Sequence, residues 1–471
     1  MARPLTRRRI DSQLIEGKIS ASIWKLAFPM MISGALQDLF SMVDLYFVGQ
    51  LGHIEVAALS MAGTVVSILV MIVQGIAIGT TALVAHSIGE KNYDRADAIL
   101  GQSFLLSTVG SLVMIALAGG TLPFILRLFG ASGEVLFYAQ AYLEITFFGS
   151  STIFFFVVIN QALRGTGDAK TPLYALVIAN LINIFLDPLL IMGYGPFSRL
   201  GVSGSAAATI FSRGVGLIFL LIHLFFGHST IRLELKHLKP SPVLMRRILS
   251  IGSFASLQVF IREISFVFLM RLVSSFGAVT LAAYGIGSRL RMAIMVPGFG
   301  FSNAASVLVG QNLGAEQPER AHRSAWQTLL YYEMIAIPLA VVFIAFAPSL
   351  VGFFNDQPEV VAVGASFLRF LGVTFPFLAI SLIFGQAMNG AGDTRTPTVI
   401  NGIGQLAFRI PVAYLLSLVA GLGPIGIWLG INSSDIIQGI GMAWAFQRGG
   451  WKKTYARHRD TLRRQTAAAS E

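Results

Sequence analysis

The sequence contains no cysteine, which excludes disulfide bonds and thiol chemistry. It is also poor in charge: Asp, Glu, Lys and Arg make up 12% of its 471 residues, whereas about 25% is usual for a soluble domain. The seven histidines show neither an HExxH pattern nor clustered ligand spacing, and no Ser-His or His-Asp arrangement is present. These absences argue against an enzyme and assign no catalytic residue.

Apolar residues take the place of the missing charges, with 55% hydrophobic residues and a mean hydropathy of +0.72. Apolar runs of 18 or more residues recur from Ser22 to Phe446, and each is long enough to cross about 30 Å of hydrocarbon as a helix. We therefore predict an all-α polytopic membrane protein with twelve transmembrane helices. The predicted spans are residues 22–49, 56–84, 98–122, 135–160, 171–193, 203–226, 247–275, 279–309, 324–347, 360–388, 396–419 and 424–446.

The net charge of +11 is unevenly distributed along the chain. Of the 34 Lys and Arg residues, 25 fall at the termini and in one alternating set of loops, two fall in the opposite loops, and seven lie within spans. This asymmetry predicts that both termini and the 227–246 linker are cytoplasmic. We expect the protein to lie in the cytoplasmic (inner) membrane of a bacterium or archaeon. The first twenty residues are too polar for a cleavable signal peptide. The basic tail is interpreted as a contact with membrane lipids, and we expect no nucleic-acid partner.

The chain consists of two related halves. A shift of 225 residues aligns 161–172 (QALRGTGDAKTP) with 386–397 (QAMNGAGDTRTP), with seven of twelve positions identical. Each half carries six predicted spans, so the halves form two six-helix lobes related by a parallel internal repeat. The GDxxTP segments are interpreted as structural loops, because Gly, Asp and Pro suit a turn that leads into a helix. The predicted parts are 1–21 (cytoplasmic segment), 22–226 (first lobe), 227–246 (cytoplasmic linker), 247–446 (second lobe) and 447–471 (basic cytoplasmic tail).

Two acids, Asp44 and Asp187, lie inside long apolar stretches. A charged side chain near the bilayer centre costs roughly 2.5–3.5 kcal/mol, so such residues usually face a protein interior or an aqueous cavity. Asn180, Asn183 and Asp187 share one helical stripe at i, i+3 and i+7. The pattern predicts a cation site. A buried carboxyl beside a second acid is easier to protonate, and carboxylate and amide oxygens also suit Na⁺, so either ion is compatible with these residues.

These residues resemble the multidrug and toxic compound extrusion (MATE) family of cation-coupled antiporters. The resemblance extends from about Ile19 to Phe446. It rests on Pro29 followed by the segment 45–52 (LYFVGQLG), the paired GDxxTP loops, and the segment 180–188, which reads NxxNxxxDP. It implies two six-helix lobes that open alternately to each side of the membrane, and export of small organic compounds in exchange for H⁺ or Na⁺. No cofactor is implied other than the coupling ion, and we expect a monomer.

The resemblance also implies roles for individual residues. In the branch of the family whose cation site lies in the first lobe, the matching cation-coupling positions are Asp44, Asn183 and Asp187, with Ser205 as a further hydroxyl ligand. Na⁺ would bind at these four residues. Pro29 matches a proline associated with bending of the first helix, and Gln37 a polar cavity position. The second-lobe site of another branch looks incomplete, because Glu263 matches its first acid but 360–388 contains neither Asp nor Glu.

The repeat supports the first-lobe site independently. The 225-residue shift places Leu269 and Val412 opposite Asp44 and Asp187, so the duplicated scaffold does not require these acids. Asp38 aligns with Glu263, which is consistent with a shared structural or cavity role. Pro188, like Pro29, is either a fixed kink or part of a moving element. The remaining candidate cavity or substrate residues are Arg289 and Arg291, which lie among the arginines that outnumber the acids in the second-lobe spans.

The leading hypothesis is a secondary antiporter for small amphipathic organic compounds. A lipid-linked precursor flippase is an alternative that favours a large basic cavity. An intramembrane enzyme would need a nucleophile, which is not evident. A channel is disfavoured, because the duplication repeats no pore motif.

Overall fold

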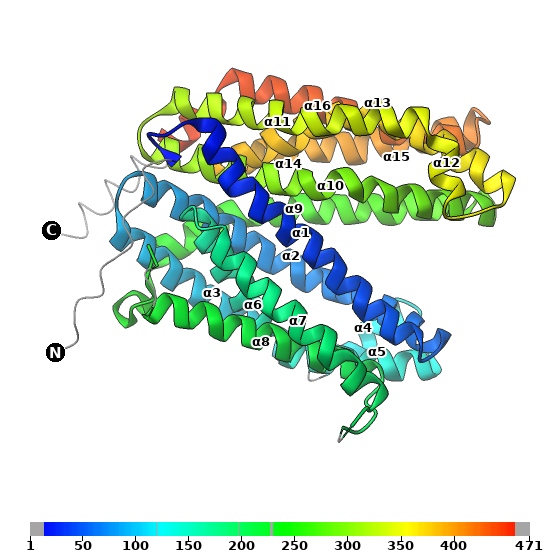
Figure 1. Cartoon of the computed structure of the whole chain (residues 1–471), viewed down its shortest axis with the longest axis horizontal. Helices are drawn as coiled ribbons and strands as arrows, with labels where there is room; N and C mark the ends of the chain where they lie inside the picture. The colour runs from blue at the N-terminus through cyan, green and yellow to red at the C-terminus, as the bar shows by residue number, and fades with distance from the viewer. Residues whose placement is uncertain (1–13, 119, 196, 227–228, 457–471) are drawn as a thin grey trace. The chain divides into compact units, whose positions relative to one another are not determined.

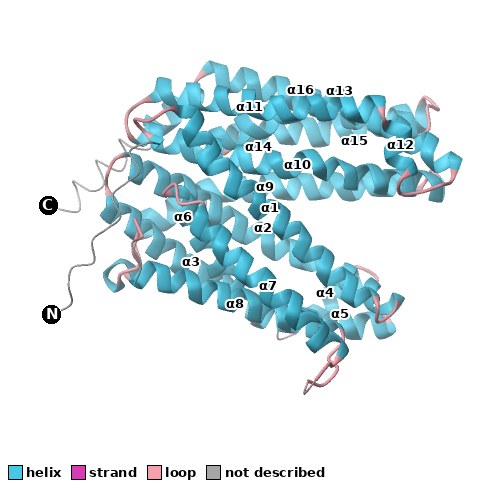
Figure 2. Ribbon diagram, viewed as in Figure 1, coloured by secondary structure: helices cyan, strands magenta, loops and turns pink. Residues whose placement is uncertain are grey.

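The protein is described here by a computed structural model that covers residues 14–118, 120–195, 197–226 and 229–456. These residues form helices joined by short loops and contain no strand (Figure 2). Most of the N-terminal segment 1–21 and of the basic tail 447–471, and the start of the linker 227–246, lie outside the described residues. The prediction of an all-α polytopic protein is confirmed.

The described residues form two compact units. Unit 1 comprises residues 32–253 and unit 2 comprises residues 14–31 and 254–456. The boundary therefore passes through two long helices, α1 (Ile19–Gly49) and α9 (Pro242–Ser274). The first part of α1 packs in unit 2 and the remainder in unit 1, whereas α9 begins in unit 1 and ends in unit 2.

Unit 1 is a helical bundle that includes the second part of α1. Its other helices are α2 (His53–Gly89), α3 (Tyr93–Ala118), α4 (Leu122–Leu128), α5 (Gly133–Phe148), α6 (Ser150–Gly165), α7 (Lys170–Met192), α8 (Val202–Phe226), the 3₁₀ turn η2 (Leu235–Leu238) and the start of α9 (Figure 1). α2 packs against α3, α5 and α6, and α7 packs against α8. The large apolar core of this unit is built mainly from α2, α3, α5 and α6.

Unit 2 is a second helical bundle, formed by the first part of α1, the second part of α9 and the helices that follow α9. They are α10 (Gly277–Gly314), α11 (Pro318–Ala345), α12 (Ala347–Gly352), α13 (Pro358–Gly390), α14 (Arg395–Gly402), α15 (Ile410–Tyr414), α16 (Pro424–Arg448) and two π-helical segments, η3 (Ile403–Arg409) and η4 (Leu415–Val419). α13 packs against α10, α11 and α16, and these four helices run side by side in Figure 1.

Each of the twelve predicted spans coincides with a helix or a broken helix. Among the described residues, ten helices are long and apolar enough to cross a membrane, counting Arg395–Val419 as one. The predicted span 135–160 is a pair of helices, α5 and α6, bent by 54°, and would be an eleventh. α16 has the length of a span, but Asn432, Asp435 and Gln438 interrupt its apolar residues, and it is not among these ten.

The GDxxTP loops have matching hydrogen bonds in the two units. Asp168 accepts hydrogen bonds from the amide and the hydroxyl of Thr171 at 3.0 and 2.7 Å. Asp393 accepts the same two from Thr396, at 3.2 and 2.8 Å. The preceding Gly167 and Gly392 have φ angles of 93° and 83°, which a residue with a side chain rarely adopts. The interpretation of these segments as structural loops is confirmed.

The linker between the lobes is bound to α3. Gln102 donates to the carbonyl oxygens of His237 and Lys239, at 2.8 and 2.9 Å, and its own oxygen accepts from the amide of Ser241 at 2.8 Å. The amide of Arg232 donates to the Asp97 carboxylate at 2.7 Å. The seventh span begins five residues before its predicted start, at Pro242 instead of 247. The described part of the linker is thus integrated into unit 1.

Candidate functional site

Asp44 and Asp187 meet inside unit 1. Asp44 lies in the second part of α1 and Asp187 near the C-terminal end of α7, and their carboxyl groups are close enough to interact electrostatically. Two ionised carboxylates repel each other, so a proton or a cation between them is favourable. Asp187 is fully buried. The two acids that the sequence singled out therefore form a pair that is suited to holding one proton or one cation.

The polar stripe on α7 arranges further oxygen atoms around this pair. Asn183 lies one helical turn before Asp187 and donates a hydrogen bond from Nδ2 to Asp187 Oδ1, at 3.2 Å. The Asn183 side chain also interacts electrostatically with the Asp44 carboxyl. Helical periodicity puts Asn183 and Asp187 on one face, and the packing of α7 turns that face toward α1.

α8 adds a residue that sequence reasoning missed. Thr209 donates a hydrogen bond from Oγ1 to Asp44 Oδ2, at 3.5 Å. It lies one turn after Ser205 on the same face of α8, so the identification of Ser205 contained a signal that could have found it. Ser205 itself is fully buried. The site is therefore built from three helices.

Five buried side-chain oxygens of the predicted residues have no hydrogen-bond partner in the structure. They are Asp44 Oδ1, Asn180 Oδ1, Asn183 Oδ1, Asp187 Oδ2 and Ser205 Oγ. Buried polar atoms are normally paired, and each unpaired one costs about 1–3 kcal/mol. A hard cation would bind carboxylate, amide and hydroxyl oxygens of this kind, and a proton would occupy the carboxyl pair. The residues present thus fit Na⁺ and H⁺ alike.

Asn180 has a second role that the stripe did not predict. Its Nδ2 donates to the backbone carbonyl of Leu36 on α1, at 2.7 Å, and so ties α7 to α1 two turns away from Asp44. The guanidinium of Arg213 on α8 interacts electrostatically with Asp44 and lies over the ring of Phe40, with its carbon 5.3 Å from the ring centroid. With both acids ionised, Asp44, Asp187 and Arg213 together carry a net charge of −1.

The other candidate residues lie outside this buried site. Gln37 and Asp38 on α1 are exposed within unit 1. In unit 2, Arg289 on α10 is exposed, and Glu263 on α9 is exposed and forms an ion pair with Arg262 at 3.9 Å. Pro29 and Pro188 lie within α1 and α7, and both helices continue through them. Pro29 lies two residues before the point at which α1 passes from unit 2 to unit 1.

Arg291, a candidate substrate residue, is paired with an acid of the same unit. It forms an ion pair with Asp435 on α16 at 3.0 Å, and Arg409 of η3 forms a second ion pair with the same carboxylate, also at 3.0 Å. The pairing of charges within one lobe, rather than unpaired arginines, accounts for these two side chains. Among the described residues, no other arginine of the unit 2 spans is bound to Asp435.

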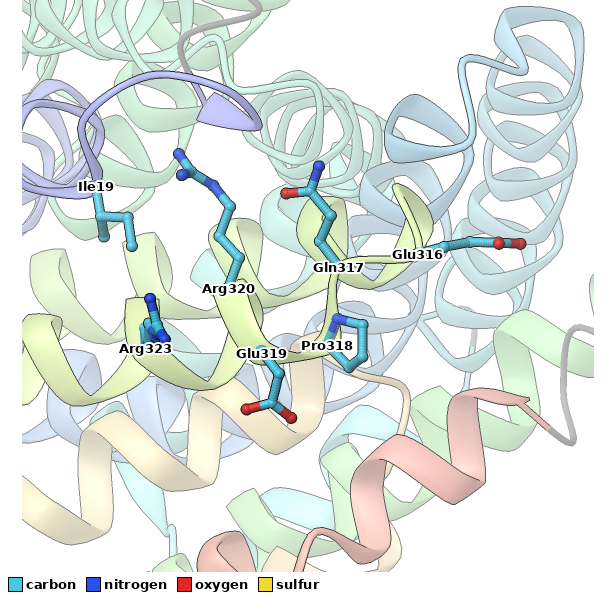
Figure 3. A pocket seen from close by; sticks show the side chains of 7 residues that line it. All are labelled: Ile19, Glu316, Gln317, Pro318, Glu319, Arg320 and Arg323. Carbon is cyan, nitrogen blue, oxygen red and sulfur yellow. The ribbon is translucent and has the colours of Figure 1, made fainter.

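Unit 2 also contains a cavity of about 460 Å³ at the start of α11 (Figure 3). Its lining residues are Ile19, Glu316, Gln317, Pro318, Glu319, Arg320 and Arg323. Arg320 donates to the carbonyl oxygen of Gly17. None of the predicted site residues lines this cavity.

Comparison with known proteins finds a matching family model and similar transporters. The family model MatE matches residues 29–189 and 255–415, two segments offset by 226 residues. The first segment contains Asp44, Asn183 and Asp187. The chain is 27% identical over 439 residues to "Probable multidrug resistance protein NorM" of Thermotoga maritima, covering 93% of this chain and 94% of that protein. It is 28% identical over 445 residues to an "FAD transporter" of Shewanella oneidensis, covering 92% and 96%.

Solved structures show the same similarity in three dimensions. A crystal structure of MATE in the bent conformation has a TM-score of 0.88 and 26% sequence identity, covering 96% of this chain and 100% of that chain. A transporter of the MOP superfamily from Pyrococcus furiosus, described as having a binding pocket of reverse polarity, has a TM-score of 0.87 and 26% identity, covering 95% and 99%.

Proposed function

The chain belongs to the MatE family of transporters, and we propose that it is a secondary antiporter that exports small amphipathic organic compounds in exchange for H⁺ or Na⁺. The electrostatically coupled pair Asp44 and Asp187, with the unpaired buried oxygens around it, carries this proposal. Relatives named as multidrug resistance and multidrug export proteins support drug-like cargo. Neither a lipid-linked precursor flippase nor an intramembrane enzyme is favoured by these relatives.

The coupling step is a change of charge at the carboxyl pair. A bound proton removes one negative charge and converts an acceptor oxygen into a donor. A bound Na⁺ would balance the negative charge and be coordinated by the unpaired oxygens. Either event removes the cost of unpaired buried charge and changes which partners Asp44 can bind. The helices α1, α7 and α8 would then pack differently in the loaded and the empty states.

α1 is the element through which this change would reach the rest of the molecule. Asp44 lies in the part of α1 that packs in unit 1, and the part before Ile32 packs in unit 2. Pro29, just before this boundary, has no backbone N–H and so weakens the helix locally. We propose that Pro29, and Pro188 beside Asp187, are the places at which α1 and α7 change shape.

The protein is a multi-pass membrane protein, and we propose that it resides in the cytoplasmic membrane with both termini in the cytoplasm. The asymmetry of Lys and Arg between the loops supports this orientation. We further propose that it works as a monomer surrounded by lipid and needs no cofactor other than the coupling ion.

Transport by the purified protein in liposomes tests this function. H⁺ and Na⁺ gradients are imposed separately, and uptake is measured for a panel of cationic, neutral and anionic compounds. The expected result is cargo movement against its gradient, driven by at least one ion and lost when that gradient is collapsed. Movement that is equally fast without any ion gradient would contradict antiport.

A further inference from the structure

Unit 2 contains a buried cluster of charge formed by Arg291, Arg409 and Asp435. Arg291 and Arg409 each donate from Nη2 to a different oxygen of Asp435, both at 3.0 Å. The three residues come from α10, η3 and α16, so the cluster joins three helices of one unit. One carboxylate is therefore shared between two guanidinium groups.

The cluster contains one positive charge that no acid within it neutralises. Two arginines and one aspartate give a net charge of +1. Asp435 is 3% and Arg409 8% exposed, and an uncompensated charge at such depth is costly. Arg409 Nε is buried and has no hydrogen-bond partner. Among the described residues, neither arginine has an ion pair other than the one with Asp435. The cluster thus has both the charge and a donor for an additional anion.

Other acids of the unit 2 spans do not supply that anion. Glu263 forms its ion pair with Arg262. Glu333 on α11 has no ion pair among the described residues, and its Oε2 is buried without a partner. The missing negative charge is therefore not provided by these carboxylates in this structure.

The internal repeat shows that the scaffold does not need this cluster. The 225-residue shift aligns Arg291 with Val66, Arg409 with Ile184 and Asp435 with Ile210, all apolar. Ile184 and Ile210 directly follow Asn183 and Thr209, two residues of the unit 1 site. Two pairs of corresponding elements, α7 with η3 and α8 with α16, thus contribute to a cluster of net charge −1 in unit 1 and to a cluster of net charge +1 in unit 2.

The backbone at Arg409 is also unusual. η3 is π-helical from Ile403 to Arg409, so Arg409 ends a segment of wider helical turns. Short π-helical segments are frequent at functional sites. This geometry sets Arg409 against α16, whereas the side chain of Arg291 is 20% exposed and is the accessible member of the cluster.

We propose that the Arg291–Asp435–Arg409 cluster is an anion-binding site that receives the carboxylate or phosphate group of a transported organic anion. Arg409 stays on Asp435, and Arg291 turns from Asp435 to the incoming anion, which it binds with paired N–H donors. The anion neutralises the excess charge. This inference rests on the proposed export function and specifies its substrate class: amphipathic organic acids and phosphates, in addition to cationic or neutral drugs.

Binding by the full chain in a non-ionic, phosphate-free detergent tests this site without an ion gradient. The probes are carboxyfluorescein as an organic anion and rhodamine as an organic cation, and binding is followed by fluorescence anisotropy. Arg291→Gln should weaken binding of the anion at least tenfold and change binding of the cation less than twofold. Arg291→Lys should restore part of the anion affinity, because it retains the charge.

Two further variants distinguish anion binding by the cluster from a purely structural role of its residues. Arg369→Gln removes an exposed arginine from α13 of the same unit and should leave both affinities unchanged. Asp435→Asn raises the net charge of the cluster to +2 and should tighten anion binding severalfold. Equal weakening of both probes in Arg291→Gln, an equal loss in Arg369→Gln, or weaker anion binding in a folded Asp435→Asn protein would overturn the proposal.

Failure of the proposed anion site can be distinguished from failure of the proposed export function. Loss of ion-driven transport in the unmodified protein would reject antiport but would leave the anion affinity as measured. Intact antiport together with unchanged anion affinity in Arg291→Gln would reject the anion site alone.

Discussion

Thr209 on α8 donates a hydrogen bond to the carboxylate of Asp44 on α1, at an Oγ1–Oδ2 distance of 3.5 Å, across 165 residues of sequence. The acid on which ion coupling is proposed to depend is thus held from α8 as well as from α7. A hydrogen bond from this hydroxyl is stronger when the acceptor oxygen is charged than when it is neutral.

Thr209→Val tests this bond directly. Valine keeps the shape of threonine but lacks the hydroxyl, and a long hydrogen bond to a charged group is worth about 1 kcal/mol, so the ion concentration for half-maximal transport should change roughly fivefold. Thr209→Ser keeps the donor and should stay within twofold of the unmodified protein. The measurement is the ion dependence of cargo uptake in liposomes, and unaltered ion dependence in the valine variant would assign Thr209 a packing role.

Asp44→Asn and Asp187→Asn should each abolish coupled efflux while expression is retained. Asparagine preserves the volume but cannot release a proton or supply a charged ligand to Na⁺. Glu144→Gln is the matched control, because Glu144 lies in a span of the same unit and bonds to Gln140 at 2.8 Å. Drug-driven ion exchange is recorded in liposomes, and full exchange by both aspartate variants would reject the assignment of the site.

H⁺ and Na⁺ should compete for this site. A protonated carboxyl cannot act as an anionic ligand, so lowering the pH should raise the Na⁺ concentration needed for half-maximal binding, and raising the pH should lower it. The effect should disappear in Asp187→Asn. Isothermal calorimetry of Na⁺ binding at several pH values measures this, and a Na⁺ affinity independent of pH would place the two ions at separate sites.

The loop acids Asp168 and Asp393 should both contribute to stability, because each accepts two hydrogen bonds from the threonine three residues later. Asp168 also accepts a hydrogen bond from the amide of Lys170 at 3.1 Å and lies 3.8 Å from His223 Nε2, so its contribution should be the larger. Replacing either with alanine should cost about 0.5–2 kcal/mol, as for other residues that cap the first turn of a helix. Asp168→Asn and Asp393→Asn keep an acceptor oxygen and should cost less. Thermal unfolding in detergent gives the comparison, and a large loss in only one of the two repeats would argue for a role beyond the turn.

Gln102→Leu should release the linker from α3. Three hydrogen bonds of 2.8–2.9 Å join Gln102 to His237, Lys239 and Ser241, and their loss leaves backbone groups unpaired at a cost of about 1–3 kcal/mol. Limited proteolysis should then cleave between residues 229 and 241 faster than in the unmodified protein. Gln140→Leu, which removes a glutamine from α5, is the control.

Local features of this protein were readable from its sequence because they depend on neighbours along the chain. Hydropathy located the helices, and the 225-residue shift located the repeat. The i, i+4 spacing of Asn183 and Asp187 already implied their hydrogen bond, since one helical turn brings such residues together. The same reasoning missed the break at Gly149 between α5 and α6, because both halves of that span are apolar.

Only the tertiary structure decided which helix faces meet. Nothing near Thr209 indicates that its hydroxyl points to Asp44, and nothing near Arg291 indicates that it shares Asp435 with Arg409. The passage of α1 and α9 from one unit to the other is likewise invisible in a hydropathy pattern. The physical reason is that helical periodicity fixes the direction of a side chain about its own axis, whereas contacts between distant helices depend on how whole surfaces pack.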